Sequence, residues 1–206
     1  MGATVARPKY QGELTHGLRH GRGRMVWADG RMYDGEFRRG LRQGQGTLEL
    51  ANGDQYVGEW QNDQMHGHGT YTSAEEGEYD GHWANGLREG YGKLRLKAGT
   101  VYDGGFSQHR YHGQGLLKLK DGTCYEGEFF RGQMQGTGSR TFADGSMYEG
   151  EFHQGDCNGK GRWFSSFSQP RTAASGQSKG RQSGPLFDGT FLDGRPVDGE
   201  MILPNG

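Results

Sequence analysis

Apolar and polar residues alternate along short stretches of this chain. In the stretch 33–37, Tyr-Asp-Gly-Glu-Phe, the two rings fall on one side and the two carboxylates on the other. The stretch 44–50, Gly-Gln-Gly-Thr-Leu-Glu-Leu, alternates in the same way, with glycines and leucines on one side. Both stretches predict short β-strands, and helix signals are nearly absent along the whole chain.

Short turn sequences separate these predicted strands. Residues 38–43 form a glycine-bearing connection that suits a hairpin, and a second kind of turn follows each pair of strands. An Asp-Gly or Asn-Gly pair favours a tight turn because both positions tolerate a positive φ. Such pairs occur at Asp29-Gly30, Asn52-Gly53, Asp121-Gly122 and Asp144-Gly145. Each unit is therefore two antiparallel strands, and successive units continue as a meander.

The same phrase returns every 23 residues and begins with a tyrosine each time. The seven tyrosines are Tyr10, Tyr33, Tyr56, Tyr79, Tyr102, Tyr125 and Tyr148. A strict period of this length means an array of one small unit, and arrays present long surfaces more often than catalytic pockets. We expect an all-β fold, an elongated meander of stacked antiparallel β-hairpins. Rings would cover the glycines across the strands, and twist would curl the sheet into an open trough.

The unit YxGEFxxGxxxGxGxxxxxDGxx resembles the MORN repeat (membrane occupation and recognition nexus). Seven copies run from Tyr10 to Phe164 without a slip of register, and a degenerate copy begins at Phe187. The resemblance implies a non-enzymatic scaffold or adaptor in the cytoplasm. It also implies association with cytoskeletal assemblies, including the axonemes of cilia and flagella, and attachment near membranes.

This pattern divides the chain into four parts. They are an N-terminal tail at 1–9, seven repeats at 10–164, a flexible insertion rich in Ser, Gly and Gln at 165–185, and a degenerate eighth repeat or cap at 186–206. The insertion is either a docking or phosphorylation segment or a tolerated surface loop. The chain could also be the repeat portion of a larger enzyme.

Composition narrows the class of protein. Hydrophobic residues make up only 31% of the chain, but the net charge is −1 and the aromatic residues recur in register, which disordered chains lack. The two cysteines, Cys124 and Cys157, form no CxxC pair, which argues against a disulfide framework or a zinc site and fits a reducing compartment. No apolar run approaches the length of a membrane span.

Charge is unevenly placed along the repeats. Residues 1–46 contain nine Lys or Arg and four acidic residues, whereas residues 47–80 contain eight acidic residues and no Lys or Arg. The basic end could meet an acidic partner or an anionic phospholipid membrane, or could simply be a solvated edge. The candidate patch consists of Arg19, Arg22, Arg24, Arg38, Arg39 and Arg42.

Residues that suggest catalysis or ligand binding keep the period of the repeat. The Gly-x-Gly pairs never continue as a nucleotide-binding motif. The histidines His20, His66 and His112 share one repeat position, as do the glutamates Glu13, Glu36, Glu59, Glu128 and Glu151. We expect the histidines to have structural turn roles and the glutamates to bond a turn backbone or a cross-strand neighbour. The sequence therefore predicts no enzyme activity, metal site, cofactor or nucleic-acid partner.

The aromatic stripe is the remaining candidate site. Its rings are either the packing between repeats or the wall of an apolar groove for a helical or extended protein segment. The candidate groove consists of Tyr33, Phe37, Tyr56, Trp60, Tyr79 and Trp83. The open strands at the ends of the sheet would also allow a homodimer.

Overall fold

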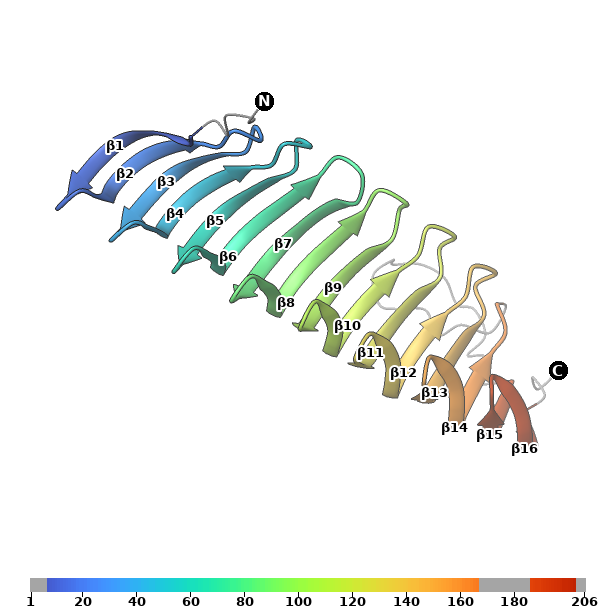
Figure 1. Cartoon of the computed structure of the whole chain (residues 1–206). Helices are drawn as coiled ribbons and strands as arrows, with labels where there is room; N and C mark the ends of the chain where they lie inside the picture. Colours follow the sequence, from blue (N-terminus) through green and yellow to red (C-terminus); the bar gives the residue numbers. More distant parts are fainter. Residues whose placement is uncertain (1–6, 167–185, 203–206) are drawn as a thin grey trace, which may run out of the picture. The chain divides into compact units, whose positions relative to one another are not determined.

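The computed structural model describes residues 7–166 and 186–202, and these residues form one open sheet of sixteen antiparallel strands. Each strand pairs with the strands before and after it in the sequence, so the expected meander of hairpins is confirmed (Figure 1). No helix long and apolar enough to cross a membrane occurs in the part of the chain that the structure describes.

The chain divides into two compact units, which are described separately. The N-terminal unit comprises residues 1–99 and 105–110, and the C-terminal unit comprises residues 100–104 and 111–206. The first eight strands are β1 (Lys9–Thr15), β2 (Leu18–Val26), β3 (Met32–Arg38), β4 (Leu41–Glu49), β5 (Gln55–Gln61), β6 (Gln64–Ser73), β7 (Gly77–Ala84) and β8 (Leu87–Leu96). The other eight are β9 (Val101–Ser107), β10 (Arg110–Lys118), β11 (Cys124–Phe130), β12 (Gln133–Thr141), β13 (Met147–His153), β14 (Asp156–Phe164), β15 (Phe187–Leu192) and β16 (Arg195–Met201).

Each described hairpin of the N-terminal unit contains an irregularity at the same place. In the β3–β4 hairpin Gly35 lies opposite Gly46, and the register then shifts so that Phe37 lies opposite Arg42. Between these two pairs Glu36 of β3 lies opposite three residues of β4, 43–45, so the two extra residues of this β-bulge belong to β4. Residues that lie opposite each other share a face of the sheet, so the tyrosines and their partners form one face, called here the aromatic face. The other face, called the polar face, carries the alternate residues.

The bulge explains both the repeated glutamate and one of the repeated glycines. The Glu36 carboxylate accepts a hydrogen bond from the backbone N–H of Gln45 at 3.1 Å. A side chain on the intervening Gly44, whose φ is +67°, would lie 2.6 Å from that carboxylate. Matching bonds join Glu13 to Arg22, Glu59 to His68 and Glu128 to Thr137. The sequence predicted that these glutamates would bond either a turn backbone or a cross-strand neighbour. The structure shows that they bond the backbone of the adjacent strand.

The core of each unit is a single layer of rings over glycine. The tyrosines Tyr33, Tyr56, Tyr79, Tyr102, Tyr125 and Tyr148 are almost completely buried. The Tyr33 hydroxyl donates to the Glu36 carbonyl at 3.0 Å, and its ring covers Gly46. Burial raises the pKa of Tyr33 well above its ordinary value. The phenol therefore stays neutral, and ring burial supplies much of the hydrophobic stabilisation.

Edge-to-face contacts connect one repeat to the next. Tyr33 meets Phe37 of its own repeat at 5.1 Å between ring centroids and Trp60 of the following repeat at 5.3 Å. Such contacts contribute about 0.5–1.5 kcal/mol each beyond the buried area. In the C-terminal unit Tyr148 meets Phe152 at 5.2 Å and Phe191 of β15 at 4.8 Å. Each tyrosine is thus covered by a ring from the next hairpin.

The turns between paired strands are shorter than the expected connection at 38–43. β3 ends at Arg38 and β4 begins at Leu41, so only two residues, Arg39 and Gly40, form the turn, and both have a positive φ. Two equivalent turns carry a second residue other than glycine, Asp63 at φ 66° and His109 at φ 67°. A side chain in this backbone region costs about 1–2 kcal/mol.

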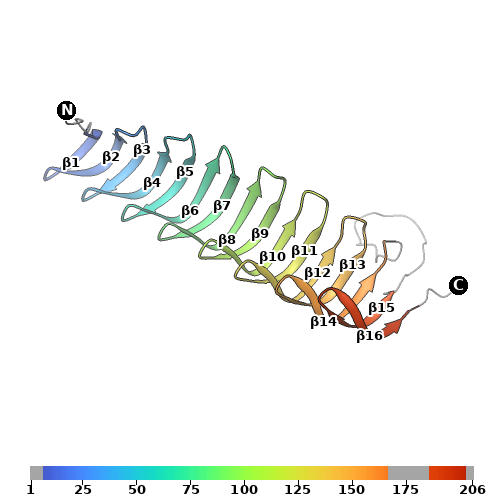
Figure 2. The same cartoon turned by 45° about the vertical axis from the view of Figure 1, so that its right-hand side comes forward.

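The parts of the chain beyond the seven repeats are described incompletely. β15 and β16 pair as an antiparallel hairpin, which falls in the stretch 186–206 assigned to an eighth repeat or cap. Figure 2, the same ribbon turned, shows this hairpin next to β14 in the C-terminal unit. The insertion expected at 165–185 lies almost wholly outside the described residues, as does most of the tail at 1–9.

Replacing Gly58 with Ala tests the packing of rings on glycine. The added methyl group would lie 2.5 Å from the Gly69 Cα and 2.7 Å from the Tyr56 hydroxyl, and backbone cannot easily move away. We expect the free energy of unfolding, measured with urea, to fall by about 2 kcal/mol. Gly53→Ala is the matched control, because that site has space and a φ of +87°, so the substitution only adds backbone strain and lowers stability by about 1 kcal/mol. A Gly58→Ala protein as stable as the control would contradict the proposed packing.

Candidate functional site

The six rings predicted to form a binding groove are buried. Tyr33 is 0% exposed and Trp83, the most exposed of the six, is 6% exposed. The indole N–H of Trp60 donates to the Gly46 carbonyl at 3.1 Å, and that of Trp83 donates to the Gly69 carbonyl at 2.9 Å. These rings therefore hold the repeats together. Tyr56, Tyr79 and Trp83 also border one cavity, and Phe37 borders another.

That cavity, called here the apolar groove, lies on the aromatic face of the N-terminal unit. Its volume is about 430 Å³. The apolar part of its wall is made by Leu48, Leu50, Met65, Tyr71, Trp83 and Leu94. Leu48, Tyr71 and Leu94 lie opposite successive tyrosines in the register, and Met65 lies opposite Trp60. Side chains that differ between repeats thus line a space whose floor is the repeated aromatic stack.

One wall of the groove carries a fixed polar group. The Tyr71 hydroxyl donates to Asp54 Oδ2 at 2.7 Å, and the other carboxylate oxygen accepts from the Ala74 N–H at 3.3 Å. The hydrogen bond from Tyr71 is the main reason that the pKa of Asp54 is lowered. Burial raises the pKa of Tyr71 to about 12. The Tyr71 ring is therefore neutral and anchored on its own protein at physiological pH.

Arg88 and His109 also line the groove. The backbone N–H and the Nε–H of Arg88 both point to His109 Nδ1 at 3.3 Å, so Nδ1 is the acceptor and Nε2 carries the proton. Burial, followed by the charge of Arg88, lowers the pKa of His109. His109 thus presents a neutral ring from a turn position where every other repeat except the one with Asp63 has glycine. Strained positions of this kind are often retained for function.

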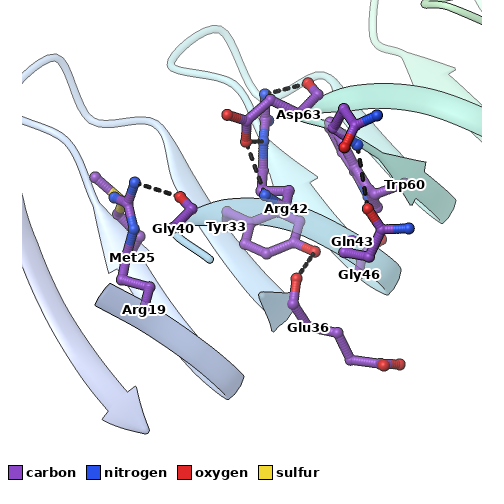
Figure 3. Close-up of polar contacts among 11 residues, drawn as sticks. Arg19, Met25, Tyr33, Glu36, Gly40, Arg42, Gln43, Gly46, Trp60 and Asp63 are labelled. Atoms are coloured by element: carbon purple, nitrogen blue, oxygen red, sulfur yellow. Dashed lines mark hydrogen bonds and ion pairs between the residues drawn. The ribbon is translucent and has the colours of Figure 1, made fainter. Parts of the chain in front are cut away.

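A second cavity on the same face, called here the basic pocket, has a volume of about 300 Å³. Two hydrogen bonds hold Arg42 in the wall of this pocket, because its backbone N–H and Nε both donate to Asp63 Oδ1, at 2.8 and 3.1 Å. The Arg42 guanidinium also lies 4.1 Å from the centroid of the Trp60 ring (Figure 3). The full lining is Arg19, Met25, Trp27, Arg31, Phe37, Arg42 and Asp63.

The six arginines of the predicted anionic-partner patch do not form one surface. Arg19 and Arg42 lie on the aromatic face, opposite Leu14 and Phe37. Arg22, Arg24 and Arg38 lie on the polar face, and Arg39 lies in a turn. On the polar face Arg22 is opposite Glu36 and Arg24 is opposite Asp34. The pleat of the strands separates arginines that are close in the sequence.

The structure places the histidines and cysteines inside strands. His20, His66 and His112 lie in β2, β6 and β10, and not in the turns expected for them. Among the described residues no group of three or more His, Cys, Asp or Glu side chains could hold a metal ion. Both cysteines are free, and burial raises the pKa of the Cys157 thiol to about 11.

Several residues of the two cavities were missed by the sequence analysis. Met65 and Tyr71 occupy repeat positions that vary between copies, so no periodic signal marks them. Asp63 and His109 did carry a signal, because they replace the glycine found at the other turns. A search for departures from the repeat at positive-φ positions would have found both.

The repeats match the family model for the MORN repeat at residues 10–30, 33–55, 56–77, 79–101, 102–124, 125–147 and 148–166. The chain therefore belongs to the MORN repeat family. MORN repeats are binding modules for proteins or membranes and are typically non-enzymatic. A search for relatives among curated proteins finds no significant match.

Two of the solved structures that match the chain are domains bound to partner peptides. The TCP domain of SAS-4 (dCPAP) of Drosophila melanogaster, in complex with a proline-rich motif of Ana2 (dSTIL), is 14% identical, with 81% of this chain and 77% of that chain covered and a TM-score of 0.34. The TCP10 domain of Danio rerio CPAP, in complex with a peptide of Danio rerio STIL, is 15% identical, with coverage of 89% and 99% and a TM-score of 0.33. TM-scores this low support no argument about fold or function.

Titration of His109 tests the wall of the groove formed with Arg88. We expect NMR to give a pKa below the ordinary value of 6.5, and Arg88→Met to raise it part of the way back, since burial remains. Because the folded pKa is depressed, the stability due to neutral His109 is present above pH 6.5 and is lost as the pH falls through the folded pKa. Arg95→Met is the control, because Arg95 pairs with Glu78. An unchanged pKa in Arg88→Met would contradict the contact.

Proposed function

We propose that this protein is a non-enzymatic scaffold or adaptor that binds a segment of a protein partner in the apolar groove. The observation that carries the proposal is a cavity of about 430 Å³ whose apolar wall rests on fully packed rings. Peptide recognition commonly uses an apolar groove bordered by a few oriented polar groups. Here the polar groups are the Tyr71–Asp54 pair and the Arg88–His109 pair.

The rigidity of the groove favours this role. Trp83 cannot turn away, because its ring meets Tyr79 at 5.1 Å and Tyr56 at 5.4 Å while its N–H is bonded. A wall that is already fixed loses little conformational entropy when a partner binds, which improves affinity. Met65 and Leu94, which occupy variable repeat positions in the wall of the groove, give the binding of the partner its specificity.

The chemistry of the groove also sets the character of the partner. Residues 47–80, which supply much of the wall, contain eight acidic residues and no Lys or Arg, and two of the acidic residues, Glu76 and Glu78, line the groove itself. We infer a segment that combines apolar or aromatic side chains with basic residues placed over this acidic stretch. Charge complementarity of this kind raises the association rate and fixes the register of the partner.

The wider setting follows from the family resemblance. We propose a place in a cytoskeletal assembly of the cytoplasm, such as that of a cilium or flagellum. Attachment to anionic phospholipid is less well supported, since the candidate arginines are divided between the two faces of the sheet. A homodimer through the terminal strands β1 and β16 stays a prediction.

Met65→Glu tests the groove. A carboxylate in the apolar wall would be desolvated by a bound partner, so we expect affinity to fall by at least about tenfold. Partners are first recovered by proximity labelling in the native cell, and each is then purified and titrated against the full chain by calorimetry.

Val57→Glu is the matched control, because Val57 lies in the same repeat on the polar face and is 47% exposed. Circular dichroism and urea unfolding must show both variants folded. A direct partner bound equally by Met65→Glu and by the unaltered protein would refute the groove as its site.

A further inference from the structure

The basic pocket and the apolar groove are the same position of the repeat, two repeats apart. Phe37 in one pocket corresponds to Trp83 in the other, and Arg42 corresponds to Arg88, each pair separated by 46 residues. The remaining corresponding pairs are Arg19 and Met65, Met25 and Tyr71, Arg31 and Gly77, and Asp63 and His109. A segment lying across the strands of the N-terminal unit would therefore meet two equivalent pockets with different linings.

The linings differ in charge. In the basic pocket Arg42 and Asp63 largely neutralise each other through a contact of 3.1 Å. Arg19 instead donates to the uncharged Gly40 carbonyl at 2.6 Å, and this hydrogen bond does not neutralise its positive charge (Figure 3). Arg31 contacts Asp29 at 2.7 Å, but its side chain remains 46% exposed and also lies over the Trp27 ring. The apolar groove has methionine and glycine at the positions of Arg19 and Arg31.

The distance between the pockets follows from the sheet. Phe37 lies in β3 and Trp83 in β7, and the strands between them pair in unbroken order on one face. Four steps of about 4.8 Å place the two pockets about 19 Å apart. An extended segment covers that span in about six residues, and a helix covers it in about thirteen.

We propose that the partner segment carries a carboxylate bound in the basic pocket about 19 Å from a large apolar side chain seated in the apolar groove. The carboxylate accepts hydrogen bonds from N–H groups of Arg31 and Arg19. The indole of Trp27 forms the wall at that end of the pocket. This inference rests on the proposed function and adds to it the order of the partner's side chains along the N-terminal unit. Arginine suits this role because its planar fork matches a carboxylate.

A protein carboxylate is favoured over a lipid headgroup by the arrangement of the arginines. A membrane surface would require cations spread over one broad face, whereas Arg22 and Arg24 lie on the other face opposite acidic residues. The basic pocket holds the Arg19 and Arg31 guanidinium groups within one cavity of about 300 Å³.

The test is a selection of random peptides of about 20 residues, long enough for either spacing, displayed on phage against the full chain. We expect the enriched sequences to carry Asp or Glu about six or about thirteen positions from Trp, Phe, Leu or Met. Synthetic copies of these peptides are then titrated against Arg31→Ser, against Met65→Glu and against Arg24→Ser, the control on the polar face.

Each outcome decides the proposal. Support requires that Arg31→Ser weaken binding at least tenfold and that Arg24→Ser change it less than twofold. Peptides without an acidic preference that still depend on Met65 would overturn the inference and leave the proposed function standing. Peptides that ignore both Arg31 and Met65 would overturn both. Binding of vesicles with about 30% phosphatidylserine that requires Arg31 and displaces the peptides would assign the basic pocket to lipid instead.

Discussion

The contact of a tyrosine ring with a pair of glycines is the constraint on which the rest of the structure depends. Gly35 and Gly46 lie opposite each other, and the Tyr33 ring covers the space that two side chains would otherwise fill. A single sheet has no second layer to bury its face, so the rings must lie flat against the backbone. The period of the sequence is the period of this contact.

Much of the fold could be predicted because the same alternation of residues and the same kinds of turn sequence recur in successive repeats. Alternation predicted the strands, and turn dipeptides predicted the hairpins. The bulge opposite Glu36 could not be predicted, since the register shift depends on which backbone N–H the carboxylate reaches. The candidate site was predicted less well. The rings chosen for the groove are mainly core, and the cavity wall lies at variable positions such as Met65 and Tyr71.

Repetition and specificity are separated in this molecule. The repeated aromatic residues pack against one another and form the floor of both cavities. The residues at variable repeat positions form the walls and supply either charge or apolar surface. One backbone thus offers the same recess with different chemistry, cationic at Arg19 and apolar at Met65. Arrays gain distinct binding surfaces in this way without changing the contacts between units.

Because the ring that covers each tyrosine comes from the next hairpin, no repeat completes its own core. Tyr148 receives its outer ring from Phe191, which follows it by 43 residues where other pairs are 27 apart. The β15–β16 hairpin consequently acts as a lid on the seventh repeat. If that hairpin loosened, one face of the Tyr148 ring would be exposed to solvent. Unfolding would then begin at the seventh repeat.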